Sequence, residues 1–344
     1  MNIAFTYNVK RHKPSKDLKQ QSDLEFDKPK VIDEIVKSLT ELNHTVYKIE
    51  ADEKAYLKLQ KLKSKIDIVL NIAEGKIGDA RESQIPMFCE VLQIPYTHSS
   101  PSTHAISLDK QFTKWILQGA KVVNIPESQT VSDKNYKVDK TLKFPLIVKP
   151  NKEGSSKGIM DANVVKNLSD LKKRIKFISE NFTKEVMVEE FIEGREFTVS
   201  LVGNGANLQV LPIVEQTFDF LPKGMNKIAS LELKYLYEWD SKKIHDICVC
   251  PAKISKKLEK EIIDVSKKIY KVLDIRDAAR IDYRLDKTGK LYFLEINTLP
   301  GLNPDPNEYS YYMISAEQQG LDLKSLLSLF LKSACDRYGI KKST

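Results

Sequence analysis

Short extended segments alternate with helical segments over the first hundred residues, and this order constrains the fold more than any other feature of the chain. Residues 3–7, 46–49 and 66–72 are rich in apolar and β-branched side chains, as strands are. Residues 29–43 carry apolar side chains at the i, i+3, i+4, i+7 spacing of an amphipathic helix. This order predicts a parallel sheet covered by helices, in which ligands bind beyond the carboxyl ends of the strands. The loop at 73–78 follows the third strand and is therefore a candidate binding segment.

Composition excludes several classes of protein. The 344 residues are 41% hydrophobic and 30% charged, a typical balance for a globular chain of two or three domains. The net charge of +8 comes mostly from lysine rather than arginine, which argues against a nucleic-acid reader. No window approaches the roughly 18 apolar residues of a membrane span. The four cysteines fit neither a disulfide framework nor a zinc site, so we expect a cytoplasmic protein with no membrane or nucleic-acid partner.

The remaining pattern predicts two further units. A helix is expected near 109–118, followed by a strand at 145–150, a helix at 168–181 and a strand at 185–191. Strands dominate from residue 197, and a helix at 255–273, a hairpin at 278–298 and a helix at 323–335 complete the chain. We therefore divide the chain at 1–100, 101–192 and 193–344. Trp115 is expected in the core of its helix.

A Gly/Ser loop follows the expected strand at 145–150. The strand delivers Lys149, and Gly154, Ser155, Ser156 and Gly158 follow it. Such a loop could bring backbone N–H groups close to a phosphate between flanking cations. It is not the nucleotide P-loop, because the lysine precedes the loop. A flexible polar hairpin is the alternative at this point.

The hairpin at 278–298 carries the sharpest chemical signal. A turn centred on Thr288 and Gly289 would place Asp282 opposite Glu295 and Arg280 opposite Asn297. All four side chains would then share one face, with two carboxylates close enough to repel. Magnesium would relieve that repulsion and would complete its shell with the phosphates of a nucleoside triphosphate. The alternative is a solvated face on which Arg280 and Arg284 neutralise Asp282.

Together these motifs resemble the D-alanine–D-alanine ligase branch of the ATP-grasp superfamily. The resemblance rests on ordered segments at 148–158, 188–199, 280–282 and 295–301. It implies a three-domain fold, an N-terminal parallel α/β domain followed by two ATP-grasp subdomains that hold ATP between them. The implied activity is ligation of a carboxylate to an amine through an acyl phosphate, with ATP and two magnesium ions, Mg2+, as cofactors. Relatives suggest a homodimer.

The resemblance also implies roles for individual residues. Asp282, Glu295 and Asn297 would hold magnesium, and Arg280 with the Gly301 backbone would face the developing oxyanion. Lys234 and Tyr235 match a pair on the mobile loop of the family, which we place at 217–246. The ATP-contacting set is larger and comprises Lys110, Lys149, Glu153, Ser155, Ser156, Glu189, Glu190, Phe191, Ile192, Glu196, Lys234 and Leu294.

The substrate side departs from D-alanine–D-alanine ligases. The Gly-rich turn near the N-terminus is absent, and the segments at 73–75 and 302–309 differ from the family pattern. Glu74, Glu82, Asn303 and Asp305 are candidate substrate residues, and the carboxylates of Glu74, Glu82 and Asp305 favour a cationic or amine-bearing substrate. For Glu82 and Asp305 a helix terminus and a turn are the alternatives. Three functions stay open: a ligase of other amino acids or related metabolites, a true D-alanine–D-alanine ligase, and a catalytically silent ATP-binding protein.

Overall fold

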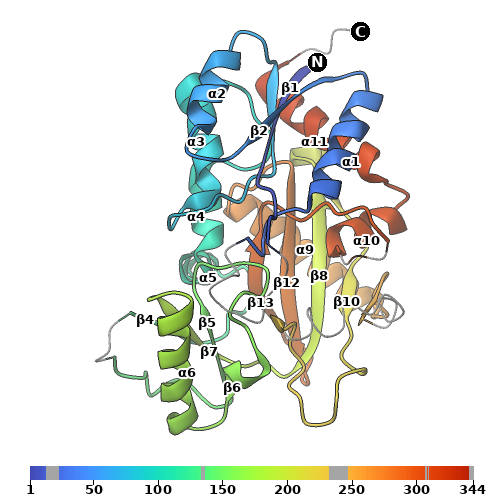
Figure 1. The fold of residues 1–344 in the computed structure, drawn as a ribbon. Helices are drawn as coiled ribbons and strands as arrows, with labels where there is room; N and C mark the ends of the chain where they lie inside the picture. The colour runs from blue at the N-terminus through green and yellow to red at the C-terminus, as the bar shows by residue number, and fades with distance from the viewer. Residues whose placement is uncertain (13–22, 133–135, 232–246, 307, 309, 341–344) are drawn as a thin grey trace.

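The computed structural model describes residues 1–12, 23–132, 136–231, 247–306, 308 and 310–340 (Figure 1). Three sheets organise this part of the chain. The first is parallel and lies at the N-terminus, whereas the other two are antiparallel. The expected combination of an α/β unit with two α+β units is therefore confirmed.

The N-terminal sheet has the strand order β2-β1-β3, and both pairings are parallel. Its elements are β1 (Asn2–Tyr7), α1 (Pro29–Glu41), β2 (Thr45–Glu50), α2 (Ala55–Leu62) and β3 (Ile68–Asn71). Proline at the first helical position of α1 costs no hydrogen bond, because that N–H has no partner within a helix. The sequence also predicts a short strand at 94–97, and this prediction is wrong in part, because only Tyr96 in this segment forms a bridge, to Val69.

Short helices lead from this sheet to the second one. They are the 3₁₀ turn η2 (Arg81–Ser83), α3 (Gln84–Leu92), α4 (Pro101–Leu108) and α5 (Lys110–Gly119). Ser100 caps α4 by accepting from the Thr103 amide, and Asp109 caps α5 by accepting from the Phe112 amide. The expectation for Trp115 is wrong, because its side chain is 54% exposed and lies against Phe112.

The second sheet has the order β4-β7-β5-β6. Its elements are β4 (Ser128–Val131), β5 (Leu146–Pro150), η3 (Asp161–Asn163), β6 (Val164–Val165), α6 (Leu168–Asn181) and β7 (Val186–Glu190). Helix α6 buries Leu171, Ile175 and Ile178 against the sheet, as its apolar spacing predicts (Figure 1). The loop between β5 and η3 contains the Gly/Ser segment.

The third sheet has the order β11-β10-β8-β12-β13, with β9 paired to β8. Its elements are β8 (Gly194–Val202), η4 (Gly205–Asn207), β9 (Gln209–Val210), β10 (Val214–Gln216), β11 (Cys248–Val249), α9 (Lys256–Val272), β12 (Ala278–Asp286) and β13 (Leu291–Asn297). Asp282 lies opposite Glu295 and Arg280 opposite Asn297, which confirms the expected register. Nearer the turn the register differs by one residue, and a bulge beside Asp282 restores it.

The two ends of the chain share one core. Helices α10 (Tyr311–Gln318) and α11 (Leu323–Tyr338) follow the third sheet and return to the N-terminal sheet, so that α11 packs beside α1 (Figure 1). Phe330 and Leu327 from α11 lie in the same buried cluster as Phe5 from β1 and Ile35 from α1. The N-terminal unit is thereby held over one end of the third sheet.

Candidate active site

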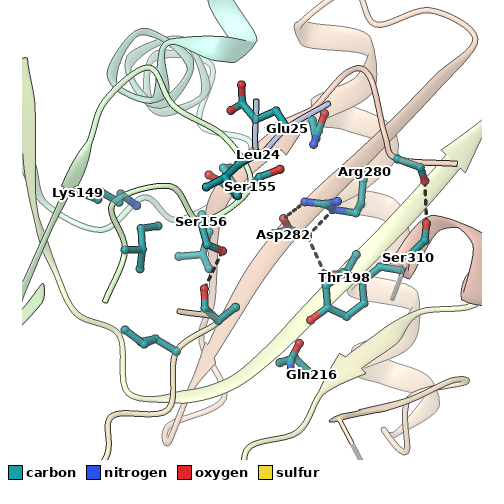
Figure 2. Close-up of a pocket in the computed structure, with 18 of the residues that line it drawn as sticks. Leu24, Glu25, Lys149, Ser155, Ser156, Thr198, Gln216, Arg280, Asp282 and Ser310 are labelled. Carbon is teal, nitrogen blue, oxygen red and sulfur yellow. Dashed lines mark hydrogen bonds and ion pairs between the residues drawn. The ribbon is translucent and has the colours of Figure 1, made fainter. Parts of the chain in front are cut away.

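A cavity of about 610 Å3 is lined by all three parts of the chain. The second sheet contributes Lys149 and the third contributes Asp282 (Figure 2). Glu189 of the second sheet and Glu295 of the third also line the cavity. The N-terminal part contributes Glu74. The motifs that lie more than a hundred residues apart in the sequence are thus brought to one place. None of the helices that the structure describes is long and apolar enough to cross a membrane.

Two lysines share one carboxylate at the end of the cavity formed by the second sheet. Glu189 pairs with Lys149 at 3.0 Å and with Lys114, whose side chain is 0% exposed. Burial lowers the pKa of Lys149 to about 8, and burial together with the nearby Lys149 charge places the pKa of Lys114 well below its ordinary value. Lys149 lies in the cavity wall, and Lys114 lies behind Glu189 and fixes that carboxylate from the protein side.

We call the part of the cavity between the second and third sheets the slot. Phe191, Ile192 and Leu294 line it, and Glu190 also borders the cavity. Glu196 pairs with Arg284 at 2.7 Å, and the Arg284 guanidinium lies 5.2 Å from the centre of the Phe191 ring. Burial raises the pKa of Glu196 even though the Arg284 charge opposes it. The slot therefore combines apolar walls with a buried carboxylate, a combination suited to a base and its ribose.

The carboxylates of the third sheet are each held by a cation. Asp282 accepts from Arg280 at 3.0 Å and from the Thr198 hydroxyl at 2.7 Å (Figure 2). Glu295 lies 3.3 Å from the Lys110 ammonium. Burial alone would raise the pKa of Glu295, but Lys110, Lys149 and Arg280 outweigh it and lower the pKa to about 2.

These side chains fit a divalent metal. Asp282 and Glu295 are opposed across the ladder, and Asn297 adds an amide oxygen on the same face. The described residues hold no group of three or more His, Cys, Asp or Glu side chains spaced for a metal ion. Magnesium needs fewer protein ligands than such a group provides, because it retains waters and takes further oxygens from phosphates.

The Gly/Ser loop reaches the cavity through its two serines. Ser155 and Ser156 both adopt the left-handed backbone conformation, which is uncommon outside glycine and often marks functional loops. The Ser156 hydroxyl donates to the Ala229 carbonyl at 2.8 Å, and the Leu231 amide donates to the Ile159 carbonyl at 2.7 Å. The described part of the expected mobile segment thus lies against this loop. Lys234 and Tyr235 lie outside the described residues.

Lys110 and Glu153 connect the Gly/Ser loop to Glu295 without lining the cavity themselves. The Lys110 ammonium donates to the Glu153 carbonyl at 2.5 Å and also faces Glu295. The Glu153 carboxylate pairs instead with Lys157 at 3.0 Å. A cation is therefore held between the loop and Glu295.

The four candidate substrate residues have different positions. Glu74 lines the cavity, and burial together with the Glu25 and Glu82 charges raises its pKa well above the ordinary value. Glu82 is buried behind it, in η2 before α3, with a pKa raised by burial to about 7. Asn303 lines the cavity and donates to Glu308 at 2.7 Å. Asp305 lies outside the cavity lining and pairs with Lys30 at 2.8 Å.

Gly301 and Asp27 complete this end of the cavity. The Gly301 carbonyl accepts from the Ser310 hydroxyl at 2.7 Å (Figure 2), which fixes the turn that follows β13. Asp27 lines the same end, and burial raises its pKa to about 7. Carboxyl groups with raised pKa values gain most from a cationic neighbour, because a positive charge offsets the cost of ionising them.

Sequence reasoning missed several residues of this site. Lys114 follows Lys110 by one helical turn, and that spacing was the available signal. In the alternative interpretation of the hairpin Arg284 would neutralise Asp282, but it pairs with Glu196, because β8 lies beside β12 and places Glu196 directly opposite Arg284. Glu25 and Arg81 had no local signal, since their partners are distant in the sequence.

Comparison with known proteins places these features in a family. Residues 118–332 match the family model described as D-ala D-ala ligase C-terminus. The D-alanine–D-alanine ligase of Aquifex aeolicus is 35% identical over 86% of this chain and 92% of its own length. An uncharacterized protein of Sinorhizobium fredii, y4sG, is 32% identical over 90% of this chain and 88% of its own length.

A solved structure shows the same fold. The D-alanine–D-alanine ligase of Bacillus anthracis, crystallised with ATP, superposes with a TM-score of 0.72. The match covers 98% of this chain and 99% of the other, at 22% sequence identity. The sheets and their order are therefore those of that fold.

Proposed function

The chain belongs to the D-alanine–D-alanine ligase family of ATP-grasp enzymes, and from this premise we propose that it joins an amino-acid carboxylate to an amine with ATP. The products are an amide, ADP and phosphate. The observation that carries the proposal is the single cavity that Lys149, Asp282, Glu295 and Arg280 line together. The proposal includes the division of the chain into three domains at residues 100 and 192. The homodimer remains a prediction.

We assign the slot between the second and third sheets to the nucleotide. The base would lie between Phe191, Ile192 and Leu294, and Glu196 would accept from the ribose hydroxyls. The triphosphate would then extend toward Lys149 and the serines of the Gly/Ser loop, with Lys110 behind the loop. This direction leads from apolar walls to cations, which matches the change in character along ATP itself.

Asp282, Glu295 and Asn297 would hold the magnesium. Bound there, magnesium would supply positive charge to the phosphoryl oxygens in the transition state. Arg280 and Lys110, which neutralise the two carboxylates in the structure, would then be freed for the substrate phosphates. The low pKa of Glu295 keeps this oxygen pair anionic and ready to bind at neutral pH.

The proposed chemistry has two steps. A carboxylate oxygen of the first substrate attacks the γ-phosphorus, the bond to the β–γ bridging oxygen breaks, and ADP leaves. The amine of the second substrate then attacks the carbonyl carbon, the acyl–phosphate bond breaks, and the amine loses a proton as phosphate leaves. Arg280 faces the oxyanion of the tetrahedral centre, and such donors contribute about 3 to 4 kcal/mol each. Exclusion of water is needed because acyl phosphates hydrolyse.

The substrates are assigned by charge. Glu74 and Asp27 face the cavity at the N-terminal end, and both have raised pKa values. A substrate ammonium group between them would restore their ordinary ionisation. An amino acid as first substrate therefore suits this end better than a simple carboxylic acid.

A test of this function begins with purified protein, ATP, magnesium and pools of L- and D-amino acids. Phosphate release is measured with each pool, and products are identified by mass. We expect release with at least one pool and an amide product of matching mass. Phosphate release only with D-alanine, giving a D-alanyl dipeptide, would identify the second candidate, a true D-alanine–D-alanine ligase, which the Aquifex relative favours. ATP binding without release from any pool would identify a silent ATP-binding protein.

The metal assignment is tested by Glu295→Gln. The variant loses one anionic oxygen of the proposed site, and we expect phosphate release to fall by at least about 100-fold, as for loss of a principal transition-state contact. Glu193→Gln is the matched control, because Glu193 is exposed and pairs with Lys287 outside the cavity. An unchanged rate for Glu295→Gln would remove the metal assignment.

A further inference from the structure

Arg81 connects three segments that are far apart in the sequence. Its guanidinium donates to the Lys152 carbonyl at 2.8 Å and to the Glu25 carboxylate at 2.7 Å. The other oxygen of Glu25 accepts from the backbone N–H of Gly154 at 2.5 Å. One buried ion pair thus joins the N-terminal part of the chain to the Gly/Ser loop of the second sheet. We name these contacts among Arg81, Glu25 and Gly154 the Arg81 latch.

The latch is buried and closely fitted. The side chains of Arg81 and Glu25 are 8% and 6% exposed. A Cβ atom at Gly154 would lie 2.6 Å from the Glu25 carboxylate, so that the close approach requires glycine. Burial lowers the pKa of Arg81, but the Glu25 and Glu153 charges outweigh it, and the net effect raises that pKa above its ordinary value. Arg81 is therefore charged at any working pH.

The position of the latch separates it from an ordinary structural ion pair. Gly154 immediately precedes Ser155 and Ser156, which line the cavity, and Glu25 lines the cavity close to Ser155 (Figure 2). Glu25 therefore fixes the Gly/Ser loop from the N-terminal part of the chain. A displaced Glu25 would release the Gly154 N–H and the loop together.

We propose that Arg81 is a positioning residue that holds the Glu25 carboxylate on the Gly154 N–H and so keeps the Gly/Ser loop in place for ATP. This proposal rests on the proposed function. Arg81 does not itself line the cavity or touch the reacting atoms. It acts through Glu25, and the effect of losing it is expected in ATP use rather than in the chemical step.

The first test reads the contact without requiring turnover. Amide hydrogen exchange of the 152–158 segment is compared among the wild type, Arg81→Gln and Arg276→Gln. Arg276 is the matched control, because it pairs with Asp274 at 2.7 Å on a more exposed surface. We expect at least fivefold faster exchange in Arg81→Gln and wild-type exchange in Arg276→Gln. Unchanged exchange in a folded Arg81→Gln would overturn the latch, whatever reaction the protein catalyses.

The second test uses the amino-acid pool that supports phosphate release. In Arg81→Gln the KM for ATP should rise at least fivefold while kcat stays within about twofold, and Arg81→Lys should recover part of the loss. Glu25→Gln should raise the KM similarly, and the double variant should add little, because both act on one contact. Independent, additive effects, or a loss confined to kcat, would overturn the positioning role. Absence of turnover in the wild type would instead refute the proposed function. The amide hydrogen exchange result alone would then show whether the Arg81 latch holds the Gly/Ser loop.

Discussion

Lys114 shows how a single charge is used at a depth where charges are costly. Its side chain is 0% exposed, and Glu189 is the carboxylate that pairs with it. An ammonium buried in this way is stable only with a closely placed anion. Lys114 therefore holds Glu189 in place, and Glu189 in turn holds Lys149 at the cavity wall.

We predict that Lys114→Met destabilises the protein. The substitution retains the apolar volume of the side chain but removes one of the two lysines that pair with Glu189. Loss of one partner of a buried ion pair lowers the free energy of unfolding by about 3 kcal/mol or more. Urea unfolding measures the change. Lys173→Met is the control, since Lys173 is exposed and lies 3.8 Å from Asp170. Equal midpoints for the two variants would show that the buried pair contributes nothing.

A pH dependence is expected from Glu82. Burial raises the pKa of this carboxyl to about 7 in the folded protein, against 4.5 for an ordinary glutamate. Below pH 4.5 the group is protonated in both states, and as the pH rises toward 7 ionisation increasingly favours the unfolded state. The wild type should therefore lose stability over this window.

The Glu82→Gln variant should lack that loss, so its melting temperature relative to the wild type should rise between pH 5 and pH 8. Glu53→Gln serves as control, because Glu53 is exposed. A constant difference in melting temperature between Glu82→Gln and the wild type across this range would contradict this account. It would show that ionisation of Glu82 does not destabilise the folded state.

At the scale of elements, local pattern predicted most helices and strands well. Helix α6 begins and ends where its apolar spacing indicated, because its buried face and its Asn167 cap lie within one segment. The pairing of Asp282 with Glu295 and of Arg280 with Asn297 was predicted, but the bulge between Asp282 and Tyr283 was not. A bulge depends on packing between strands, for which one strand alone carries little signal. Trp115 was misplaced because helical spacing does not show which face is covered.

Gly194 tests the packing of β8 against β12. A Cβ atom there would lie 1.9 Å from the Leu285 carbonyl oxygen, so that Gly194→Ala must separate the two strands near Glu196. We expect a loss of about 2 kcal/mol or more, as for overpacking in a core. Thermal unfolding measures it. Gly119→Ala is the control, because nothing lies within 4 Å of a Cβ there. A stable Gly194→Ala would mean that the strands separate without cost.

At the scale of the whole molecule, the site depends on contacts that no local pattern contains. Lysines and carboxylates of the motifs were predictable, since each lies in its own strand or loop. Arg284 with Glu196, and Arg81 with Glu25, were not, because each pair joins segments that only the folded chain brings together. The substrate end is the least predictable part, since its carboxylates come from different segments of the N-terminal part.

The central claim is that a carboxylate is activated as an acyl phosphate, and isotope transfer tests it most directly. The active amino acid is supplied with 18O in its carboxylate, together with ATP, magnesium and the amine substrate, and the released phosphate is analysed by mass. Attack of the carboxylate on the γ-phosphorus predicts that each phosphate carries one 18O atom from the substrate. Amide product accompanied by phosphate without 18O would contradict the account.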